Sequence, residues 1–554
     1  MELLGYYILP NWMIVVLSAF TLLCMYLSRN KNYWKDQNIV HQKLSLSFVP
    51  LLKFLSKSRH EIDLEMTQKY GKLFGAFEGP QPSLIVAEPD IVKLVLVKDF
   101  PLLPDRRRFD LNDPLLNNTM TQAPAQQWRR IRPAASPAFA TGRLRKMNEL
   151  IQECAKVSCE HLQEAARNEE ELDAKHSHLH GVQQCGEASR GQPLSISVPG
   201  ALCSSRYFGH YTLDVIAKCA FGTKLDSHSN QTNEFVTRAS QAFQMSVNLP
   251  LLLMFYIFGM FPFLMKLIKI KLFSSERFSY FKDVCANMMK SRRESGVVHH
   301  DFLQLMMDAQ KSALSDASDP GDAENDVYSL GVDEKSNVAT QRKTLTEMEA
   351  MAQCVIFLLA GQDTTSWVIA YTVYLLALHP DVQEKLRREV DECFEQYGPE
   401  PTLDVVSKLD YLNCVISESL RLYPPAIRLE RSPVEDYVMT DTGIKLPKNC
   451  VIVIPIYAMH YDPSNFEDPY KFDPERFSEE NRGCIRPYSY LPFGAGPRNC
   501  VGMRFALQTI KLCLLHAIHS VQFVRTPRTK VPLEFSRNLG LLTAKEIIVG
   551  VKPR

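Results

Sequence analysis

Residues 493–502 read FGAGPRNCVG and hold the cysteine around which this 554-residue chain is organised. Three glycines and a proline surround Cys500, so the backbone must turn tightly there and another group can approach it closely. The apolar pattern from Met503 to Val521 predicts a helix directly afterwards, which places Cys500 at or just before a helix N-terminus. Backbone N–H groups and the positive end of the helix dipole stabilise a thiolate at such a position, and Arg498 adds a cation. The chain upstream is interpreted as forming a pocket over this cysteine.

Four roles are open to such a thiolate: a nucleophile, a redox thiol, a zinc ligand or an axial haem ligand. Zinc needs further cysteines or histidines at close spacing, and the sequence has none near Cys500. A nucleophile needs a base, which the sequence does not nominate. A haem iron needs one shielded, hydrogen-bonded ligand and cations for its propionates. A buried structural cysteine in a glycine-rich turn is the simpler alternative.

Composition narrows the classes of protein. Hydrophobic content of 45% and charged content of 23% are typical of a globular protein. The formal net charge of +1 gives no indication of nucleic-acid binding. The 14 cysteines are scattered without a CxxC pair, which fits a reducing compartment better than a disulfide framework.

The N-terminus has the pattern of a membrane anchor. Leu3 to Ser28 carries no charge and is long enough to cross a bilayer, and Arg29, Lys31 and Lys35 follow it. The positive-inside rule places these basic residues in the cytoplasm. A cleaved signal peptide is the alternative, but Glu2 replaces a basic start and no small-x-small cleavage site is present. We therefore predict three parts: an uncleaved signal-anchor at 1–28, a basic, proline-containing linker at 29–55, and a catalytic domain at 56–554.

The longest predicted helix starts with a capping-box match at Thr346 and Glu349 and continues to Leu378, where His379-Pro380 stops it. Its middle reads AGQDTT at residues 360–365. A glycine inside a helix costs about 1 kcal/mol against alanine, so it requires a structural reason. We expect a local opening of the helix there, and a kinked core helix is the alternative.

Residues 493–502 resemble the haem-binding signature of the cytochrome P-450 family, and four further motifs follow that family's order. They are WRRIR at 128–132, AGQDTT at 360–365, ESLR at 418–421 and PERF at 474–477. The resemblance runs from about Asn30 to the C-terminus. It implies a mainly α fold with a large helical lobe, a small β lobe and an N-terminal transmembrane helix.

The resemblance also implies roles for individual residues. Haem b would be held with Cys500 as the axial thiolate ligand of its iron, and five further residues would bind the cofactor: Trp128, Arg132, Arg431, Phe493 and Arg498. Asp363 and Thr364 would deliver protons to bound dioxygen. Glu418, Arg421 and Arg476 would form a buried ion network that supports the cysteine loop, because buried charges persist when mutually paired. For the cluster Arg106–Arg108, a propionate contact and a solvated turn both remain open.

The implied activity is a membrane-bound haem-thiolate monooxygenase, which inserts one oxygen atom from O2 into a lipophilic substrate. Electrons would come from NADPH through a cytochrome P-450 reductase, with cytochrome b5 as a further candidate donor. Arg129 and Arg130 are candidate docking residues for the reductase. The expected location is the endoplasmic reticulum membrane, crossed once, with the catalytic domain on the cytoplasmic face.

Within the family, DFLQ at 301–304 and the segment Tyr423–Arg431 are similar to the animal group that contains the drug-metabolising family-three enzymes and thromboxane synthase. Two alternatives stay open: an endoperoxide isomerase like thromboxane synthase that needs no reductase, and a membrane-tethered haem-binding protein or sensor. Asp363 and Thr364 favour a monooxygenase, because neither alternative needs a proton path. The sequence does not specify the substrate or the oligomeric state.

Three stretches stand apart from the helical pattern. Residues 167–211 form a polar insertion with alternating histidines at 176, 178 and 180, where the resembled family needs only a short link. A surface loop is the favoured interpretation, with metal binding as the alternative. The apolar stretch 245–265, broken by Pro250, Gly259 and Pro262, is interpreted as a helix pair at the membrane surface, with a buried helix pair or a true span as alternatives. The acidic, serine-rich stretch 312–343 is predicted to be a surface loop.

Overall fold

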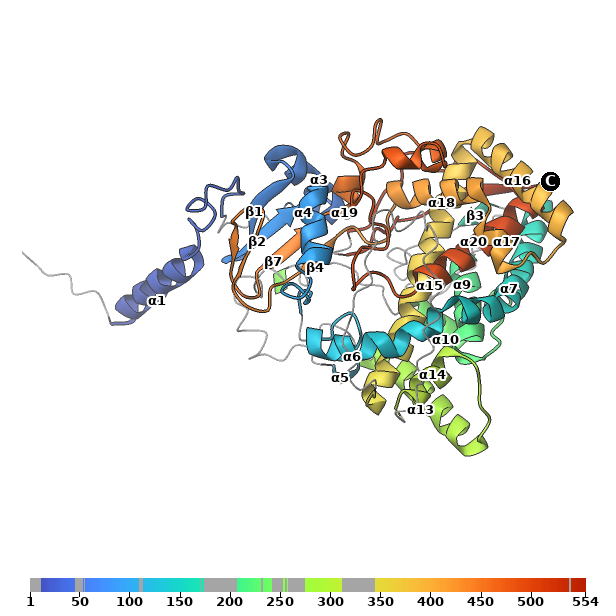
Figure 1. Ribbon diagram of the computed structural model, residues 1–554, viewed down its shortest axis with the longest axis horizontal. Coiled ribbons are helices and arrows are strands. Elements are labelled where there is room, and N and C mark those ends of the chain that lie inside the picture. The colour runs from blue at the N-terminus through green and yellow to red at the C-terminus, as the bar shows by residue number, and fades with distance from the viewer. Residues whose placement is uncertain are drawn as a thin grey trace, which may run out of the picture.

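The computed structural model describes residues 11–44, 53, 55–108, 113–169, 171–173, 207–230, 233–241, 253–254, 257, 275–310, 344–537 and 540–554. The predictions for the histidine-rich insertion, for most of the stretch 245–265 and for residues 312–343 lie outside these residues. A large helical lobe and a smaller lobe containing the main sheet lie side by side, as Figure 1 shows. The predicted mainly α fold with a small β lobe is confirmed.

Helix α15 (Glu347–Leu378) runs through the middle of the helical lobe. It packs against α9 (Tyr207–Phe221), α18 (Asp410–Leu422) and α20 (Met503–Ser520). The predicted capping box is present, since the Glu349 N–H donates to Thr346 Oγ1 at 3.2 Å and the Thr346 N–H donates to Glu349 Oε2 at 2.8 Å. α15 is long and apolar enough to cross a membrane, but 67% of the relevant window is buried inside the protein, as in a core helix.

The remaining described helices are distributed over both lobes. They are α3 (Arg59–Tyr70), α4 (Pro89–Lys93), α5 (Pro114–Asn117), α6 (Ala125–Ala135), α7 (Thr141–Arg167), α10 (Glu234–Gln241), α13 (Ser275–Ser295), α14 (Phe302–Asp308), α16 (Pro380–Tyr397), α17 (Leu403–Ser407) and α19 (Ile456–His460). Short non-α turns are η1 (Leu94–Lys98), η2 (Ser136–Phe139), η4 (Pro474–Phe477) and η5 (Arg482–Cys484).

The small lobe is built on a four-stranded sheet of order β1-β2-β7-β4. The predicted strands near residues 73–77 and 83–86 are β1 (Leu73–Glu78) and β2 (Gln81–Val86), which pair antiparallel. β7 (Val451–Ile454) pairs parallel to β2, and β4 (Leu429–Arg431) pairs antiparallel to β7. The sheet thus joins segments that are more than 300 residues apart in the sequence.

The remaining strands form two smaller sheets. β3 (Glu171–Asp173), β9 (Ile548–Pro553) and β8 (Val521–Val524) form one, and β5 (Tyr437–Val438) and β6 (Lys445–Leu446) form the other. The segment expected to be a linker, 29–55, contributes a core residue to the small lobe. Trp34 is fully buried, and its indole N–H donates to the Ala76 carbonyl at 2.9 Å.

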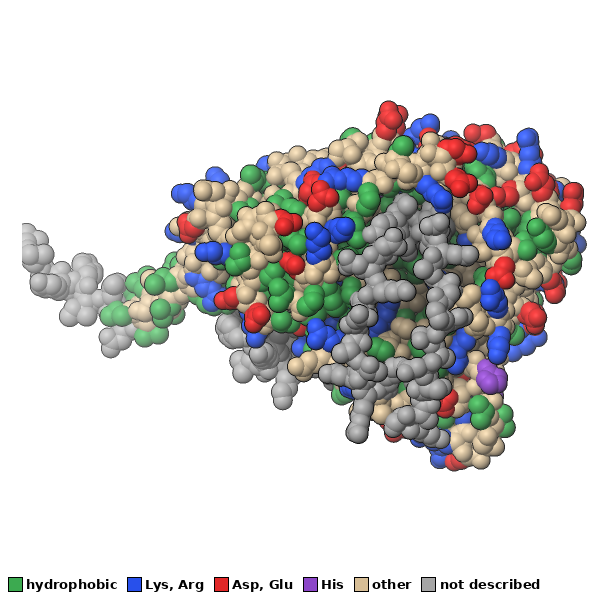
Figure 2. All heavy atoms as spheres, in the orientation of Figure 1, with side chains coloured by type: hydrophobic (Ala, Val, Ile, Leu, Met, Phe, Trp, Pro, Cys, Tyr) green, Lys and Arg blue, Asp and Glu red, His purple; other side chains and the backbone are tan. Residues whose placement is uncertain are grey.

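Helix α1 (Asn11–Ser28) projects from the small lobe, and Figures 1 and 2 show that it stands apart from the body. Its apolar side chains are exposed, including Val15 at 66% and Leu22 at 66%. Within the described residues the apolar helix Met13–Ser28 is shorter than a full membrane span, and residues 1–10 precede the described part.

The glycine in the middle of α15 lies against a side chain of α9. The helix is continuous from Glu347 to Leu378, so the local opening expected at residues 360–365 is not present as a break in the helix. A Cβ at Gly361 would lie 2.9 Å from Ile216 Cδ1 of α9. Glycine therefore lets α9 and α15 approach closely, which offsets its cost within a helix.

Arg130 joins α6 to the start of α15 and is not a free surface cation. Its guanidinium donates to Glu349 Oε2 at 2.7 Å and to the Thr344 carbonyl at 2.7 Å, and Glu349 is 3% exposed. The interpretation of Arg130 as a docking residue is therefore replaced by a structural role. Burial acts to raise the pKa of Glu349, but hydrogen bonds from Arg130, the Thr346 backbone and Gln127 outweigh it and lower the pKa to about 2.

The ion pair between Arg130 and Glu349 makes the free energy of unfolding depend on pH in a defined direction. A carboxyl whose pKa is lowered on folding contributes stability that is present above its ordinary pKa near 4.5 and is lost as the pH falls towards about 2. We expect Glu349→Gln to remove up to about 3 kcal/mol of this pH-dependent stability. Urea unfolding in detergent at several pH values between 7 and 3 measures it. Glu479→Gln, which removes an exposed carboxyl, serves as the control. An unchanged pH slope in Glu349→Gln would contradict the assignment.

Candidate active site

The loop that carries Cys500 is folded tightly at its glycines. The Cys500 N–H donates to the Phe493 carbonyl at 2.9 Å, and the Asn499 N–H donates to the Gly496 carbonyl at 3.0 Å. Gly496 has φ +71°, and a Cβ there would lie 2.1 Å from the Leu96 carbonyl oxygen of η1. Only glycine fits this approach. Because α20 begins at Met503, Cys500 lies just before a helix N-terminus, as the sequence predicted.

The Cys500 side chain is exposed, yet protein atoms surround its sulfur closely enough that burial is the main influence on its pKa. Burial raises the pKa of the thiol, while the Gly502 N–H and the nearby Arg132 and Arg106 act to lower it. A metal bound at this sulfur would hold it as a thiolate.

Four arginines converge on the same region: Arg106, Arg132, Arg431 and Arg498. Burial lowers the pKa of all four guanidinium groups, and the charges of neighbouring arginines lower the pKa values of Arg132, Arg431 and Arg498 further. The pKa falls to about 10 for Arg132 and to about 9 for Arg498. Arg431 is 1% exposed and Arg498 is 3% exposed. Asp105 lies 3.8 Å from Arg498, too far for a full hydrogen-bonded pair.

Strand pairing explains how two of these arginines come together. Asp105 bridges Ser432 in an antiparallel pair, so Arg106 lies opposite Arg431 and Arg107 lies opposite Glu430. Arg107 donates to both Glu430 oxygens, at 3.0 and 2.9 Å. Arg106 and Arg431 therefore place two positive charges opposite each other across the paired segments. Like charges in such a cross-strand position are unfavourable unless an anion binds them.

Several guanidinium N–H groups in this region have no partner within the described chain. They are Arg106 Nε, Arg431 Nε, and Nε and Nη1 of Arg498. Buried donors are normally satisfied, so a group of unpartnered donors on cations fits an anionic ligand. A haem matches the set, because its iron takes one sulfur ligand and its two propionates take the guanidinium groups.

The predicted haem-contacting residues on α6 reach the cysteine loop. Trp128 and Arg132 lie four residues apart on this helix, and Trp128 is 3% exposed. The guanidinium carbon of Arg498 lies 4.7 Å from the centre of the Trp128 ring. Arg132 donates to the Asn499 carbonyl and side-chain oxygens, each at 2.8 Å. The structure therefore brings these residues together with Arg431, Phe493 and Cys500.

Asp363 and Thr364 lie on α15, on a segment that packs over the start of α20. The ring of Phe357 contacts the ring of Phe505 in a tilted arrangement, with ring centres 5.7 Å apart. Thr364 comes seven residues after Phe357, nearly on the same helix face and about 10 Å further along. The Thr364 hydroxyl donates to the Ala360 carbonyl at 2.8 Å. Thr212 of α9 donates to the Gln362 carbonyl at 3.0 Å, so two carbonyls of this turn accept a second hydrogen bond.

Two of the three residues of the predicted ion network, Glu418 and Arg421, are fully buried, and Arg476 is partly exposed. Arg421 Nε and Nη2 donate to the two oxygens of Glu418 at 2.7 Å each, and both side chains have 0% exposure. Arg476 Nε lies 3.4 Å from Glu418 Oε1, an ion pair without hydrogen-bond geometry. Burial raises the pKa of Glu418, and the hydrogen bonds from Arg421 oppose this shift.

His460 connects this network to the cysteine loop, and sequence analysis missed it. Its Nε2 accepts from the Leu491 N–H at 3.0 Å, and its Nδ1 lies 3.0 Å from the Arg421 carbonyl. Burial and the charge of Arg421 lower its pKa to about 3, so it stays neutral and can accept. A single histidine outside any motif gives no sequence signal. Asn499 was also not assigned before the structure placed it at the site, whereas Arg106 belongs to the cluster for which a propionate contact was left open.

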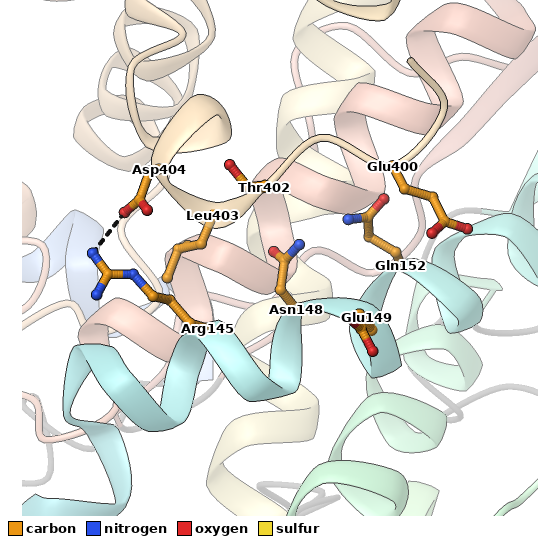
Figure 3. A pocket seen from close by; sticks show the side chains of 8 residues that line it. All are labelled: Arg145, Asn148, Glu149, Gln152, Glu400, Thr402, Leu403 and Asp404. Carbon is orange, nitrogen blue, oxygen red and sulfur yellow. Dashed lines mark hydrogen bonds and ion pairs between the residues drawn. The ribbon is translucent and has the colours of Figure 1, made fainter. Parts of the chain in front are cut away.

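Arg428 forms an ion pair with the buried carboxylate of Asp63 on α3. A separate cleft of about 260 Å³ lies between α7 and the segment 400–404 (Figure 3). Arg145 crosses it to Asp404 at 3.0 Å, and the cleft contains none of the predicted site residues.

Comparison with known proteins gives one family. The family model described as Cytochrome P-450 matches residues 42–182 and 197–551, with its gap inside the predicted insertion. Cytochrome P-450 3A41 of Mus musculus is 33% identical over 548 residues, which cover 99% of this chain and 97% of that protein. Cytochrome P-450 3A11 of Mus musculus is 33% identical over 556 residues, and 3A2 of Rattus norvegicus is 32% identical over 557 residues; each comparison covers 100% of this chain and 99% of the relative.

The buried ion pair between Glu418 and Arg421 predicts a large loss of stability when the carboxylate is removed. Glu418→Gln leaves Arg421 as a buried charge without its anion, which typically costs 3–5 kcal/mol, and we expect a loss of roughly that size. Glu475→Gln removes the partner of Lys385 at the surface and should cost about 0–1 kcal/mol. Urea unfolding midpoints of the two variants measure the difference. Equal, small losses would show that the network does not stabilise the loop.

Proposed function

The chain belongs to the cytochrome P-450 family, and we propose that it oxidises lipophilic substrates at a membrane surface with NADPH-derived electrons. Its class, a haem-thiolate monooxygenase, follows from the family. The substrate class, the electron donor and the residues that act belong to the proposal. The observation that carries it is the exposed Cys500 on a tightly turned loop, near arginines whose buried N–H groups lack partners in the described chain.

Cys500 would hold the haem iron, and Arg106, Arg431 and Arg498 would hold the propionates through their unpartnered donors. When bound, haem supplies the iron at which dioxygen is activated, and the electron-rich thiolate favours O–O cleavage. The tight glycine turn fixes the sulfur, and the ring of Trp128 supports Arg498. These residues bind and orient the cofactor.

Asp363 and Thr364 would deliver protons on the side of the haem opposite Cys500. The Thr364 hydroxyl holds its proton towards the Ala360 carbonyl in this structure. Rotation about its χ1 would free this O–H to donate into the active site. Asp363, one residue earlier, is partly buried and would bring replacement protons from solvent.

The membrane part of the proposal rests on α1. Its exposed apolar residues would lie in lipid, as part of an anchor at 1–28 followed by a linker at 29–55 and the catalytic domain at 56–554. Val40 and Val438 in the small lobe are 58% and 54% exposed.

The proposed location is the cytoplasmic face of the endoplasmic reticulum membrane. The proposed redox partners are an NADPH-dependent reductase and cytochrome b5, with exposed Arg129 as a docking candidate.

The test is turnover of a panel of lipophilic compounds, including a prostaglandin endoperoxide, with labelled dioxygen. Each reaction is run with and without reductase and NADPH. A product that needs NADPH and carries one labelled oxygen atom is the expected result. Endoperoxide rearrangement at full rate without electrons would replace the proposal with an isomerase. Haem binding with no turnover of any kind would favour a haem-binding protein or sensor.

Thr364→Ala should divert electrons to peroxide, because the proton-donating hydroxyl is lost. We expect the ratio of peroxide to product to rise about tenfold or more, within the usual contribution of proton-transfer groups. Thr372→Ala is the matched control, because Thr372 makes the same hydroxyl-to-carbonyl bond on α15, to Val368 at 2.8 Å. Peroxide and product are measured per NADPH consumed. An equal ratio in both variants would contradict the role of Thr364.

A further inference from the structure

A hydroxyl from another helix reaches the relay turn, which is the part of α15 formed by residues 360–364. Thr212 of α9 is fully buried, and its Oγ1 lies 3.0 Å from the Gln362 carbonyl oxygen. The carbonyl oxygen of Gly209, in the same helix as Thr212, lies 3.2 Å from the same hydroxyl. A hydroxyl has one proton to donate, and Gln362 offers the nearer of the two acceptors. Thr212 therefore attaches α9 to the relay turn.

The acceptor belongs to the peptide bond that joins Gln362 to Asp363. A peptide bond is planar, so a hydrogen bond to its oxygen restrains the orientation of the N–H on its other side. The backbone is thus restrained where it enters Asp363, and Thr364 follows directly. The contact from α9 lies immediately before the two residues that would deliver protons.

Two further hydroxyls bind carbonyls of this region, but both belong to α15 itself. Thr364 donates to the Ala360 carbonyl at 2.8 Å, and Ser366 donates to the Asp363 carbonyl at 3.0 Å. These bonds move with the helix, so they do not fix the relay turn relative to its surroundings. The bond from Thr212 differs because its donor lies on a separate helix.

α9 is itself held by buried contacts near Thr212. The hydroxyl of the adjacent Tyr211 donates to the Thr509 carbonyl of α20 at 2.9 Å. One turn further along α9, Ile216 lies against Gly361, where a Cβ would come within 2.9 Å of the Ile216 side chain. Tyr211 is 0% exposed and Ile216 is 1% exposed. α9 thereby connects α20, the helix that follows the cysteine loop, to the relay turn.

We propose that Thr212 is a positioning residue for proton delivery, acting on Asp363 and Thr364 through the peptide bond that precedes them. The proposal rests on the proposed monooxygenase function and on the proton role given to these two residues. Thr212 has 0% exposure, so its hydroxyl does not take up protons from solvent. It holds the relay turn in the orientation from which the Thr364 hydroxyl can donate into the active site.

The test removes the hydroxyl and keeps the shape of the side chain. Thr212→Val replaces the hydroxyl with a methyl group, and Thr212→Ser keeps the hydroxyl. Tyr211→Phe is the matched control, because it removes the adjacent buried hydroxyl of α9, which donates to a carbonyl of α20. Two quantities are measured on full-length holoprotein in detergent. They are the ratio of peroxide to product per NADPH consumed, with reductase present, and the hydrogen–deuterium exchange of the backbone amides of residues 360–366.

We expect Thr212→Val to raise the peroxide ratio about threefold, the size of effect that loss of one buried hydrogen bond typically has, and to speed the exchange of residues 360–366. Thr212→Ser should behave like the wild type in both measurements. Tyr211→Phe should keep the wild-type peroxide ratio and the wild-type exchange of residues 360–366, even if its stability falls. Because Thr212 acts through the relay, adding Thr212→Val to Thr364→Ala should leave the peroxide ratio of Thr364→Ala unchanged.

The proposal is overturned if Thr212→Val keeps the wild-type peroxide ratio or the wild-type exchange, if Tyr211→Phe raises the ratio equally, or if the effects of Thr212→Val and Thr364→Ala multiply. Each of these results would make Thr212 a packing residue of α9. If Thr212→Val does not fold, Thr212→Ala is compared with Thr212→Ser in the same way. A wild-type protein that forms no oxygenated product with NADPH would instead remove the proposed monooxygenase function, so the two failures are distinguishable.

Discussion

Four arginines gathered around one loop, where burial opposes their charge, are the constraint on which the rest of this site depends. Burial lowers the pKa values of Arg106, Arg132, Arg431 and Arg498, repulsion from neighbouring arginines adds to this shift in the last three, and the described chain offers them too few carboxylates. Burying like charges without counter-ions is costly. An anionic ligand with two carboxylates, such as a haem, would offset this arrangement, and its metal would hold the Cys500 sulfur as a thiolate. The apoprotein is therefore electrostatically incomplete at the place where we propose that it binds its cofactor.

The two lobes share the task of building this site. The small lobe supplies Arg106 and Arg431 from neighbouring segments, whose outer faces are joined by Arg107 and Glu430. The helical lobe supplies Trp128 and Arg132 from α6. The cysteine loop lies where they meet, supported from below by Arg421 through His460. Each support is a buried polar contact, so a change in one would be transmitted to the sulfur.

Local patterns allowed a large part of this architecture to be predicted from sequence. The capping box of α15, the strands β1 and β2, and the helix after Cys500 depend on residues close in the chain, and all are present. Interactions between distant segments were not predictable in the same way. The glycine at 361 fits a contact with Ile216 that no local pattern shows. Arg130 has its carboxylate on another helix, and His460 and Asn499 gain their roles only when the chain closes around the loop.

The most direct measurement of the central claim is the absorption spectrum of the reduced carbon monoxide complex, recorded for the full-length protein and for Cys500→Ser. Cys484→Ser is the control, because Cys484 is an exposed cysteine outside the loop. The account predicts a thiolate-type spectrum for the wild type and the control. It predicts that Cys500→Ser loses that spectrum while the arginine cluster still retains some haem. A thiolate-type spectrum in Cys500→Ser would show that another residue ligates the iron and would contradict the account.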